Sequence, residues 1–131
     1  MRRLAEGGLV AALTATSPAL LASPEGGPRL AGTNPIAIGI PSSDGKPLVA
    51  DVSMGRFTHG DVLTGAAAPE DVVPFGGDRA YKAFALAVGI EMLVGALAGE
   101  ERGALLVVAR PDFDPVPALR ARAEGTRLPG D

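Results

Sequence analysis

The stretch Gly32-Thr33-Asn34-Pro35-Ile36-Ala37-Ile38-Gly39-Ile40-Pro41 decides how this chain folds. Its first half is a polar turn, because Thr33 and Asn34 can fold their side chains back onto the backbone and Pro35 fixes the next φ. Its second half alternates isoleucine with small residues, which predicts a strand with one bulky face and one face open to close approach. A turn that leads directly into a strand is therefore the starting point of the fold.

Apolar runs on both sides of this stretch predict an α/β fold of the mixed α+β type. Asp44-Gly45 between two apolar runs is a hairpin signal. We expect a small mixed sheet, with the hairpin packed on one long buried helix, in a single domain over residues 1–131. The expected elements are a helix end (2–7), strands (9–14, 36–41, 48–51 and 104–109), the long helix (78–99) and a short helix (117–124), with loops at 16–31 and 65–75.

The long helix is apolar almost all round, which is typical of a helix covered on several sides. Asp78 suits its N-cap and Gly99 its C-terminal stop. Its apolar part spans only 16 residues and includes Glu91, so it falls short of the ~20 residues of a membrane span. Because so short a chain has little to cover such a helix with, we expect a homo-oligomer or a partner chain and no membrane contact.

Charge and composition exclude several classes of function. The net charge is −3, the sequence pI is about 5.1 and the basic residues are scattered, so no nucleic-acid footprint is visible. The chain has no cysteine, which excludes disulfides and thiolate metal sites and fits a cytoplasmic location. Glu6 and the Gly7-Gly8 pair interrupt the apolar run that a signal peptide needs. No metal-ligand spacing, P-loop or dinucleotide-binding glycine motif occurs.

A few charged residues are candidates for chemistry, each with an ordinary alternative. Asp51 ends an apolar strand, so it is either a strand-end cap or a carboxylate that orients a ligand. Lys82 lies in the first turn of the long helix, where it is either solvated or meets an anion at the helix N-terminus. Glu91 lies in the most apolar part of that helix and needs a partner. His59 is the only histidine and is either a surface residue or a base that titrates near neutrality.

Five segments of the chain resemble, in order, motifs of the type-2 malate/L-lactate dehydrogenase family. Residues 32–41 resemble its GTNP turn and strand. The others are residues 8–18, 47–60, 74–99 and 127–130. The resemblance implies a fragment of that family's non-Rossmann fold, with NAD or NADP as cofactor and hydride transfer to a 2-oxo or cyclic 2-imino acid. It places Thr33, Asn34, Asp51 and Lys82 along the cofactor and the active-site cleft.

The chain also departs from the family pattern. The family's N-terminal half, with its "S-H-G" catalytic histidine, has no counterpart, so we expect a truncated member whose catalytic residues are unknown; His59 occupies a position where the family usually has another residue. Three interpretations stay open. The chain is an oxidoreductase that takes missing groups from a partner chain or a second copy, a non-catalytic remnant or assembly subunit, or a scaffold reused for a cofactor-independent biosynthetic reaction such as a cyclisation.

Overall fold

The computed structural model describes residues 1–131, and contacts within it gather in two compact units. The sheet unit consists of Met1–Leu13, Ile36–Val52 and Leu106–Asp131. The helix unit consists of Thr14–Pro35 and Ser53–Leu105. The sequence predicts one domain over the whole chain, and the structure adds this division, across which the backbone passes four times.

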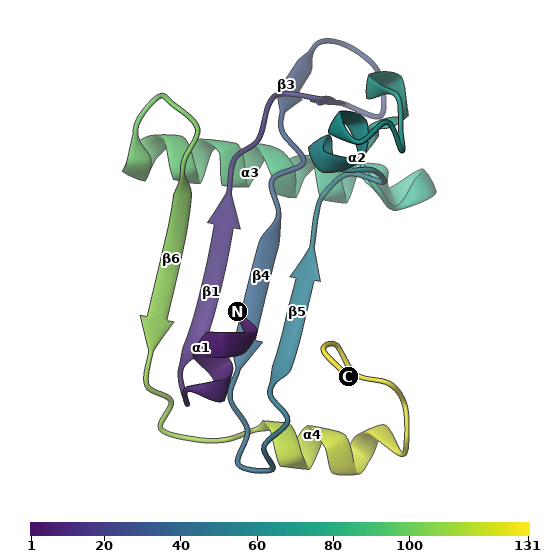
Figure 1. Cartoon of the computed structure of the whole chain (residues 1–131). Coiled ribbons are helices and arrows are strands. Elements are labelled where there is room, and N and C mark those ends of the chain that lie inside the picture. Colours follow the sequence, from purple (N-terminus) through teal and green to yellow (C-terminus); the bar gives the residue numbers. More distant parts are fainter. The chain divides into compact units, whose positions relative to one another are not determined.

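The sheet unit is built on four strands in the order β5-β4-β1-β6, and neighbouring strands run in opposite directions (Figure 1). β4 and β5 form the predicted hairpin, with Ile36 opposite Val52 and Ile40 opposite Leu48. The structure therefore confirms the α/β class and the hairpin. The strands are β1 (Val10–Ala15), β4 (Ile36–Ile40), β5 (Leu48–Val52) and β6 (Ala104–Ala109).

The small-residue face of β4 is a site of close approach, as the alternating pattern predicts. α1 (Arg2–Glu6) contacts β4. Gly39 is buried there, and a Cβ at this position would lie 3.1 Å from the Met1 backbone oxygen. Such a contact is tighter than side chains normally tolerate, so glycine lets the helix end rest on the strand.

The short helix α4 (Val116–Ala123) follows β6 and begins within a residue of its predicted start. Asp114 fixes this start by accepting hydrogen bonds from the Val116 N–H at 3.0 Å and the Ser43 N–H at 2.7 Å. The bond from the Ser43 backbone is the main cause that lowers the pKa of the Asp114 carboxyl below its usual range. One carboxylate thus joins α4 to the hairpin turn.

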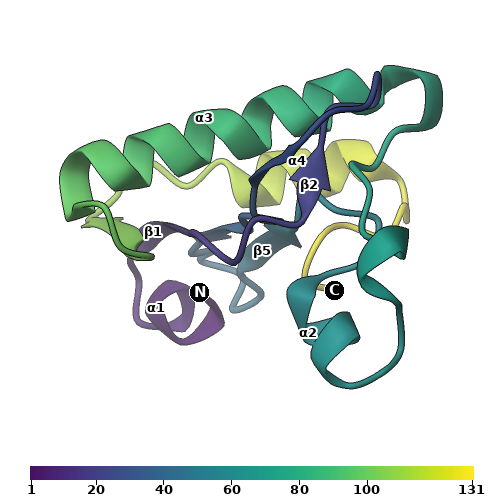
Figure 2. The same ribbon diagram turned by 90° about the horizontal axis from the view of Figure 1, so that it is seen from above.

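The helix unit is dominated by α3 (Ala80–Ala98), an unbroken helix beside which the β2–β3 ribbon lies (Figure 2). The 3₁₀ turn η2 (Gly77–Arg79) leads into it, and Arg79 occupies the N-cap position without a capping side chain. The prediction of Asp78 as N-cap is therefore wrong. Gly99, with φ of +100°, ends the helix as predicted.

The burial of α3 differs from the prediction. Its buried residues recur every three or four positions on one face and are Ala80, Ala83, Ala87, Ile90 and Val94, whereas Leu86, Met92, Leu93 and Leu97 are exposed. The helix is thus covered on one side only. Together with η2 it spans 22 residues and is long and apolar enough to cross a membrane by length and composition. The expectation that this helix falls short of a membrane span is therefore wrong by these two criteria. A soluble core helix passes the same test.

Several short elements were not predicted from the sequence. The predicted loop at residues 16–31 contains an antiparallel pair, β2 (Leu21–Ala22) and β3 (Arg29–Ala31). The aperiodic stretch before residue 64 contains α2 (His59–Leu63), whose start is fixed by a capping box between Thr58 and Asp61. A 3₁₀ turn, η1 (Pro69–Asp71), follows. β6 is predicted as a buried strand but leaves Leu106, Val107 and Val108 exposed.

The β2–β3 ribbon offers a matched test of the core. Leu21 is 0% exposed and Leu30 is 57% exposed. We expect Leu21→Ala to lower the free energy of unfolding by about 3 kcal/mol, since it removes a buried side chain and leaves a cavity. Leu30→Ala should change it by less than about 0.5 kcal/mol. Urea unfolding followed by circular dichroism measures both, and equal losses would contradict the described packing.

Candidate functional site

The turn Gly32–Asn34 is held by the side chain of Asn34, which is 0% exposed. Its Nδ2 donates to the Ala87 backbone oxygen at 2.9 Å and to Glu91 Oε2 at 2.7 Å, and its Oδ1 accepts from the Ser17 N–H at 3.0 Å. Asn34 has a φ of +29°, a region that asparagine tolerates better than most residues. One amide therefore ties the turn to both α3 and the segment after β1.

The neighbours of Asn34 complete this arrangement. The Thr33 N–H donates to Ser17 Oγ at 3.0 Å, and the Met54 N–H donates to the Thr33 backbone oxygen at 2.8 Å. Gly32 has no room for a side chain, because a Cβ there would overlap the backbone oxygen and hydroxyl of Ser17. All buried polar side-chain atoms have a hydrogen-bond partner. The turn is thus a closed network, which holds the backbone in a single conformation.

Glu91 finds the partner that its apolar surroundings require. Its Oε2 accepts from the Gly32 N–H at 3.1 Å as well as from Asn34. A pocket of about 460 Å³ opens beside this carboxylate, between α3 and the turn after it. Glu91 therefore links α3 to the turn through these hydrogen bonds. Part of its side chain also lines the pocket.

The other predicted site residues take no part in the hydrogen bonds of this network. Lys82 is exposed in the first turn of α3, and His59 is half-buried as the first residue of α2. Asp51 belongs to the sheet unit, where it is exposed on β5 and paired in register with Ala37. The structure joins Thr33 and Asn34 with Ser17 and Glu91, a grouping that sequence spacing did not reveal.

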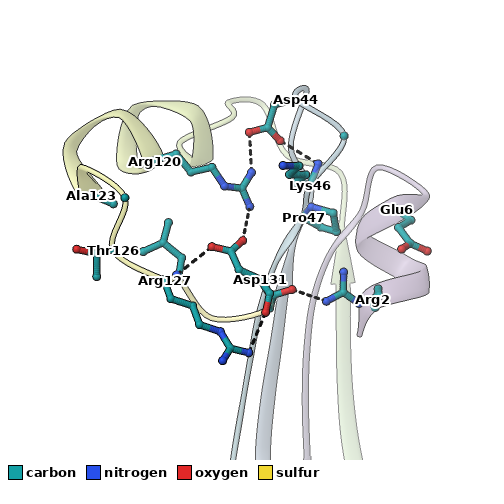
Figure 3. Close-up of a pocket in the computed structure, with 14 residues that line it drawn as sticks. Arg2, Glu6, Asp44, Lys46, Pro47, Arg120, Ala123, Thr126, Arg127 and Asp131 are labelled. Carbon is teal, nitrogen blue, oxygen red and sulfur yellow. Dashed lines mark hydrogen bonds and ion pairs between the residues drawn. The ribbon is translucent and has the colours of Figure 1, made fainter.

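A polar pocket of about 830 Å³ lies in the sheet unit (Figure 3). It is lined by α1, the turn of the β4–β5 hairpin, α4 and the C-terminal segment. Arg120 stands between two carboxylates, donating from Nη1 to Asp44 at 2.6 Å and from Nη2 to Asp131 at 3.3 Å. The hydrogen bond from Arg120 is the main cause that lowers the pKa of Asp44 to about 2, and the Lys46 N–H adds to it.

Three further cations line the same pocket. Arg2 donates to the Gly130 backbone oxygen at 2.6 Å, and Arg127 donates to the Asp131 backbone oxygen at 3.0 Å. Lys46 lies on the hairpin turn next to Asp44 (Figure 3). Since each guanidinium carries five N–H donors and each of these two uses one on a main-chain oxygen, both retain donors for an anion. The pocket thus combines four cations, of which Arg120 is ion-paired, with the carboxylates of Glu6, Asp44 and Asp131.

Sequence reasoning did not find this pocket, because its members come from distant parts of the chain. Asp44 and Arg120 are 76 residues apart, and no motif spacing links them. The only available signal was the resemblance of residues 127–130 to a C-terminal family motif. No group of three or more histidine, aspartate or glutamate side chains is arranged to hold a metal ion.

Comparison with known proteins identifies the family. The malate/L-lactate dehydrogenase family matches residues 1–72. The Δ1-pyrroline-2-carboxylate/Δ1-piperideine-2-carboxylate reductase of Pseudomonas aeruginosa is 32% identical over 121 residues, covering 74% of this chain and 35% of the relative. The (2R)-3-sulfolactate dehydrogenase (NADP⁺) of Chromohalobacter salexigens is 41% identical over 73 residues, which cover 55% of this chain and 22% of the relative.

Comparison with solved structures supports the same family. The Δ1-piperideine-2-carboxylate reductase of Pseudomonas syringae pv. tomato is 28% identical with a TM-score of 0.80, and the match covers 98% of this chain and 54% of that one. A dehydrogenase of Sinorhizobium meliloti is 25% identical, also with a TM-score of 0.80, over 98% and 53% of the two chains. The fold is that of an oxidoreductase family, and the chain belongs to the malate/L-lactate dehydrogenase family. It spans about half the length of these solved relatives.

Replacing Asn34 tests the turn network. We expect Asn34→Ala to lower the free energy of unfolding by about 3 kcal/mol, because buried backbone groups of Ser17 and Ala87 lose their partner. Glu91→Gln keeps an acceptor oxygen for Gly32 and Asn34, so it should cost no more than about 1 kcal/mol. Chemical denaturation measures both variants. A harmless Asn34→Ala would show that the network does not hold the turn.

The pocket predicts a pH dependence of stability. The folded-state pKa of Asp44 is lowered from 3.8 to about 2, so its stabilising contribution is complete above pH 3.8 and disappears as the pH falls through about 2. Asp44→Asn removes this contribution. The wild type should therefore be more stable than the variant at pH 5, and the difference should shrink toward pH 2. Urea midpoints measure it, with Asp112→Asn, an exposed carboxyl outside the pocket, as the control.

Proposed function

We propose that this chain is the cofactor-binding part of an oxidoreductase that transfers hydride between NAD(P)H and a 2-oxo or cyclic 2-imino acid. Family membership and the names of the relatives, which include an NADP⁺-dependent dehydrogenase and two cyclic imino acid reductases, support this proposal. The observation that carries it is the polar pocket, where Arg2, Lys46 and Arg127 form no ion pair with an aspartate or glutamate side chain.

The pocket fits the charged part of such a cofactor. Its volume of about 830 Å³ is within the range of small-molecule sites, and arginine binds phosphate oxygens with two parallel N–H donors. Arg2 and Arg127 would hold the phosphate groups, and Lys46 would add a point charge. Arg120 is already ion-paired with Asp44 and Asp131 and would hold the hairpin turn and the C-terminal segment in place. When bound, the cofactor supplies the hydride.

The four residues singled out by the family resemblance take two different roles in this proposal. Thr33 and Asn34 are buried and bonded within the turn, so they would act by holding backbone that faces the ligand. Asp51 and Lys82 are exposed, so each of them, in its own unit, is accessible to a ligand. A carboxylate and an ammonium group can orient a polar substrate and its developing charge.

The chain by itself does not provide every group that the reaction needs. It spans 35% or less of the length of the curated relatives, and no residue matches the family's catalytic histidine. Proton transfer requires a donor within hydrogen-bonding distance of the substrate. We therefore propose that a partner chain, a second copy or a further segment supplies the acid, and that this chain supplies cofactor binding.

Binding of the cofactor is the direct test. Calorimetry or the fluorescence of NADPH and NADH should show saturable binding to the purified chain, because the cationic pocket attracts their phosphates. Arg127→Ala and Lys82→Ala should each weaken it at least threefold, and Asp51→Asn should also weaken it. Arg122→Ala, which removes a cation of α4 outside the pocket lining, is the matched control. No binding at millimolar cofactor would overturn the proposal for the isolated chain.

A further inference from the structure

The turn of the β4–β5 hairpin contains Asp44-Gly45, the only aspartate–glycine pair in the chain. In such a pair the main-chain nitrogen of the glycine can attack Cγ of the aspartate, because glycine has no side chain to obstruct the approach. Both residues are exposed, and a Cβ on Gly45, which has a φ of +78°, would meet nothing within 4 Å. Crowding by neighbouring atoms therefore does not prevent this reaction.

The reaction proceeds through a cyclic succinimide and needs no oxidant or cofactor. The Gly45 nitrogen bonds to Cγ of Asp44, and the hydroxyl of the neutral carboxyl group leaves as water together with the proton of the Gly45 amide. Water then opens the ring. Addition at Cγ restores the aspartate, whereas addition at the main-chain carbonyl of Asp44 gives an isoaspartate, in which the main chain runs through Cβ and Cγ. The first step therefore requires the neutral carboxyl group and a free amide.

Arg120 keeps the carboxyl group of Asp44 in its ionised form. Its Nη1 donates to Asp44 Oδ2 at 2.6 Å, and the Lys46 N–H donates to Asp44 Oδ1 at 2.9 Å. The hydrogen bond from Arg120 is the largest cause that lowers the pKa of Asp44 from 3.8 to about 2. Near neutral pH this lowering reduces the fraction of neutral carboxyl groups by roughly sixtyfold. The ion pair thus removes the form of the side chain that reacts.

Hydrogen bonds in the turn also hold the attacking nitrogen. The Gly45 N–H donates to the Ser42 backbone oxygen at 3.1 Å. Asp114, just before α4, accepts from the Ser43 N–H and from Ser43 Oγ at 2.7 Å each. The turn is therefore tied to the α4 region at two points, by Asp114 and by Arg120. Of these two residues, only Arg120 acts on the carboxyl group that would react.

We propose that Asp44-Gly45 is a site of isoaspartate formation that Arg120 keeps unreactive, and that the site reacts when this ion pair is lost. The product has one more carbon in the main chain of the turn and its carboxylate directly on Cα, so Arg120 no longer meets its partner in the same place. Because Asp44 and Arg120 line the polar pocket, the modification also alters that pocket. The inference concerns the chemistry of the turn and does not depend on the proposed cofactor binding.

Replacing Arg120 tests the proposal directly. The wild type, Arg120→Gln and Arg122→Gln are incubated near neutral pH, digested and analysed by mass spectrometry. The succinimide is recognised by the loss of one water, and the isoaspartate by its electron-transfer fragments. Asp44 should be modified about tenfold faster in Arg120→Gln, because more of its carboxyl group is neutral. Arg122→Gln changes an exposed cation of α4 outside the pocket lining, so it should match the wild type.

A second variant separates the ionisation of Asp44 from a general loosening of the turn. Asp114→Asn weakens the tie to Ser43 and leaves the Arg120 ion pair in place, so it should accelerate the modification far less than Arg120→Gln does. Circular dichroism verifies that both variants fold. If Arg120→Gln does not fold, the wild type at high salt replaces it. Salt screens an exposed ion pair, so modification should then be severalfold faster than at low salt.

The whole chain unfolded in urea gives the rate of an unprotected pair, and the folded wild type should be modified much more slowly than this reference. Three results would overturn the proposal. They are a folded wild type that reacts as fast as the unfolded chain, a folded Arg120→Gln that reacts no faster than the wild type, and an equal acceleration in Asp114→Asn and Arg120→Gln.

Discussion

The buried amide of Asn34 is the interaction on which the helix unit depends. It reaches the Ser17 backbone on one side and α3 on the other, so the segment after β1, the turn and the long helix are fixed by one side chain. A shorter residue would not span these partners, and an aspartate would lack the two N–H donors that Ala87 and Glu91 receive. The local rule that asparagine favours turns is satisfied here, but the long-range bonds determine its position.

The composition of the inner face of α3 suits that contact. For Asn34 to donate to the Ala87 backbone oxygen, the turn must approach the helix backbone closely. The small side chain of Ala87 leaves room for this approach, and Ile90 and Val94 are buried on the same face. Leu86, Leu93 and Leu97 lie outside this face and are exposed.

The sequence predicted the elements with strong local patterns. The β4–β5 hairpin, the stop of α3 at Gly99 and the strand β6 were all readable from turn residues and apolar runs. The sequence patterns did not predict features that depend on a distant residue or on a very short segment. α2 depends on one Thr58–Asp61 capping box, the pocket depends on Arg120 reaching Asp44 across 76 residues, and the exposure of α3 depends on which residues pack on it. Periodicity reports that a residue is apolar, and it does not report whether anything covers it.

In this chain the GTNP motif of the family has a structural role, because it holds the turn before β4. Thr33 and Asn34 use their polar groups within the turn, and the Met54 N–H takes the Thr33 backbone oxygen. Gly55 packs against the same turn, since a Cβ there would lie 2.8 Å from the Thr33 methyl group. A sequence can keep such a signature because its fold requires the turn, whereas the groups that touch a ligand are free to change around it.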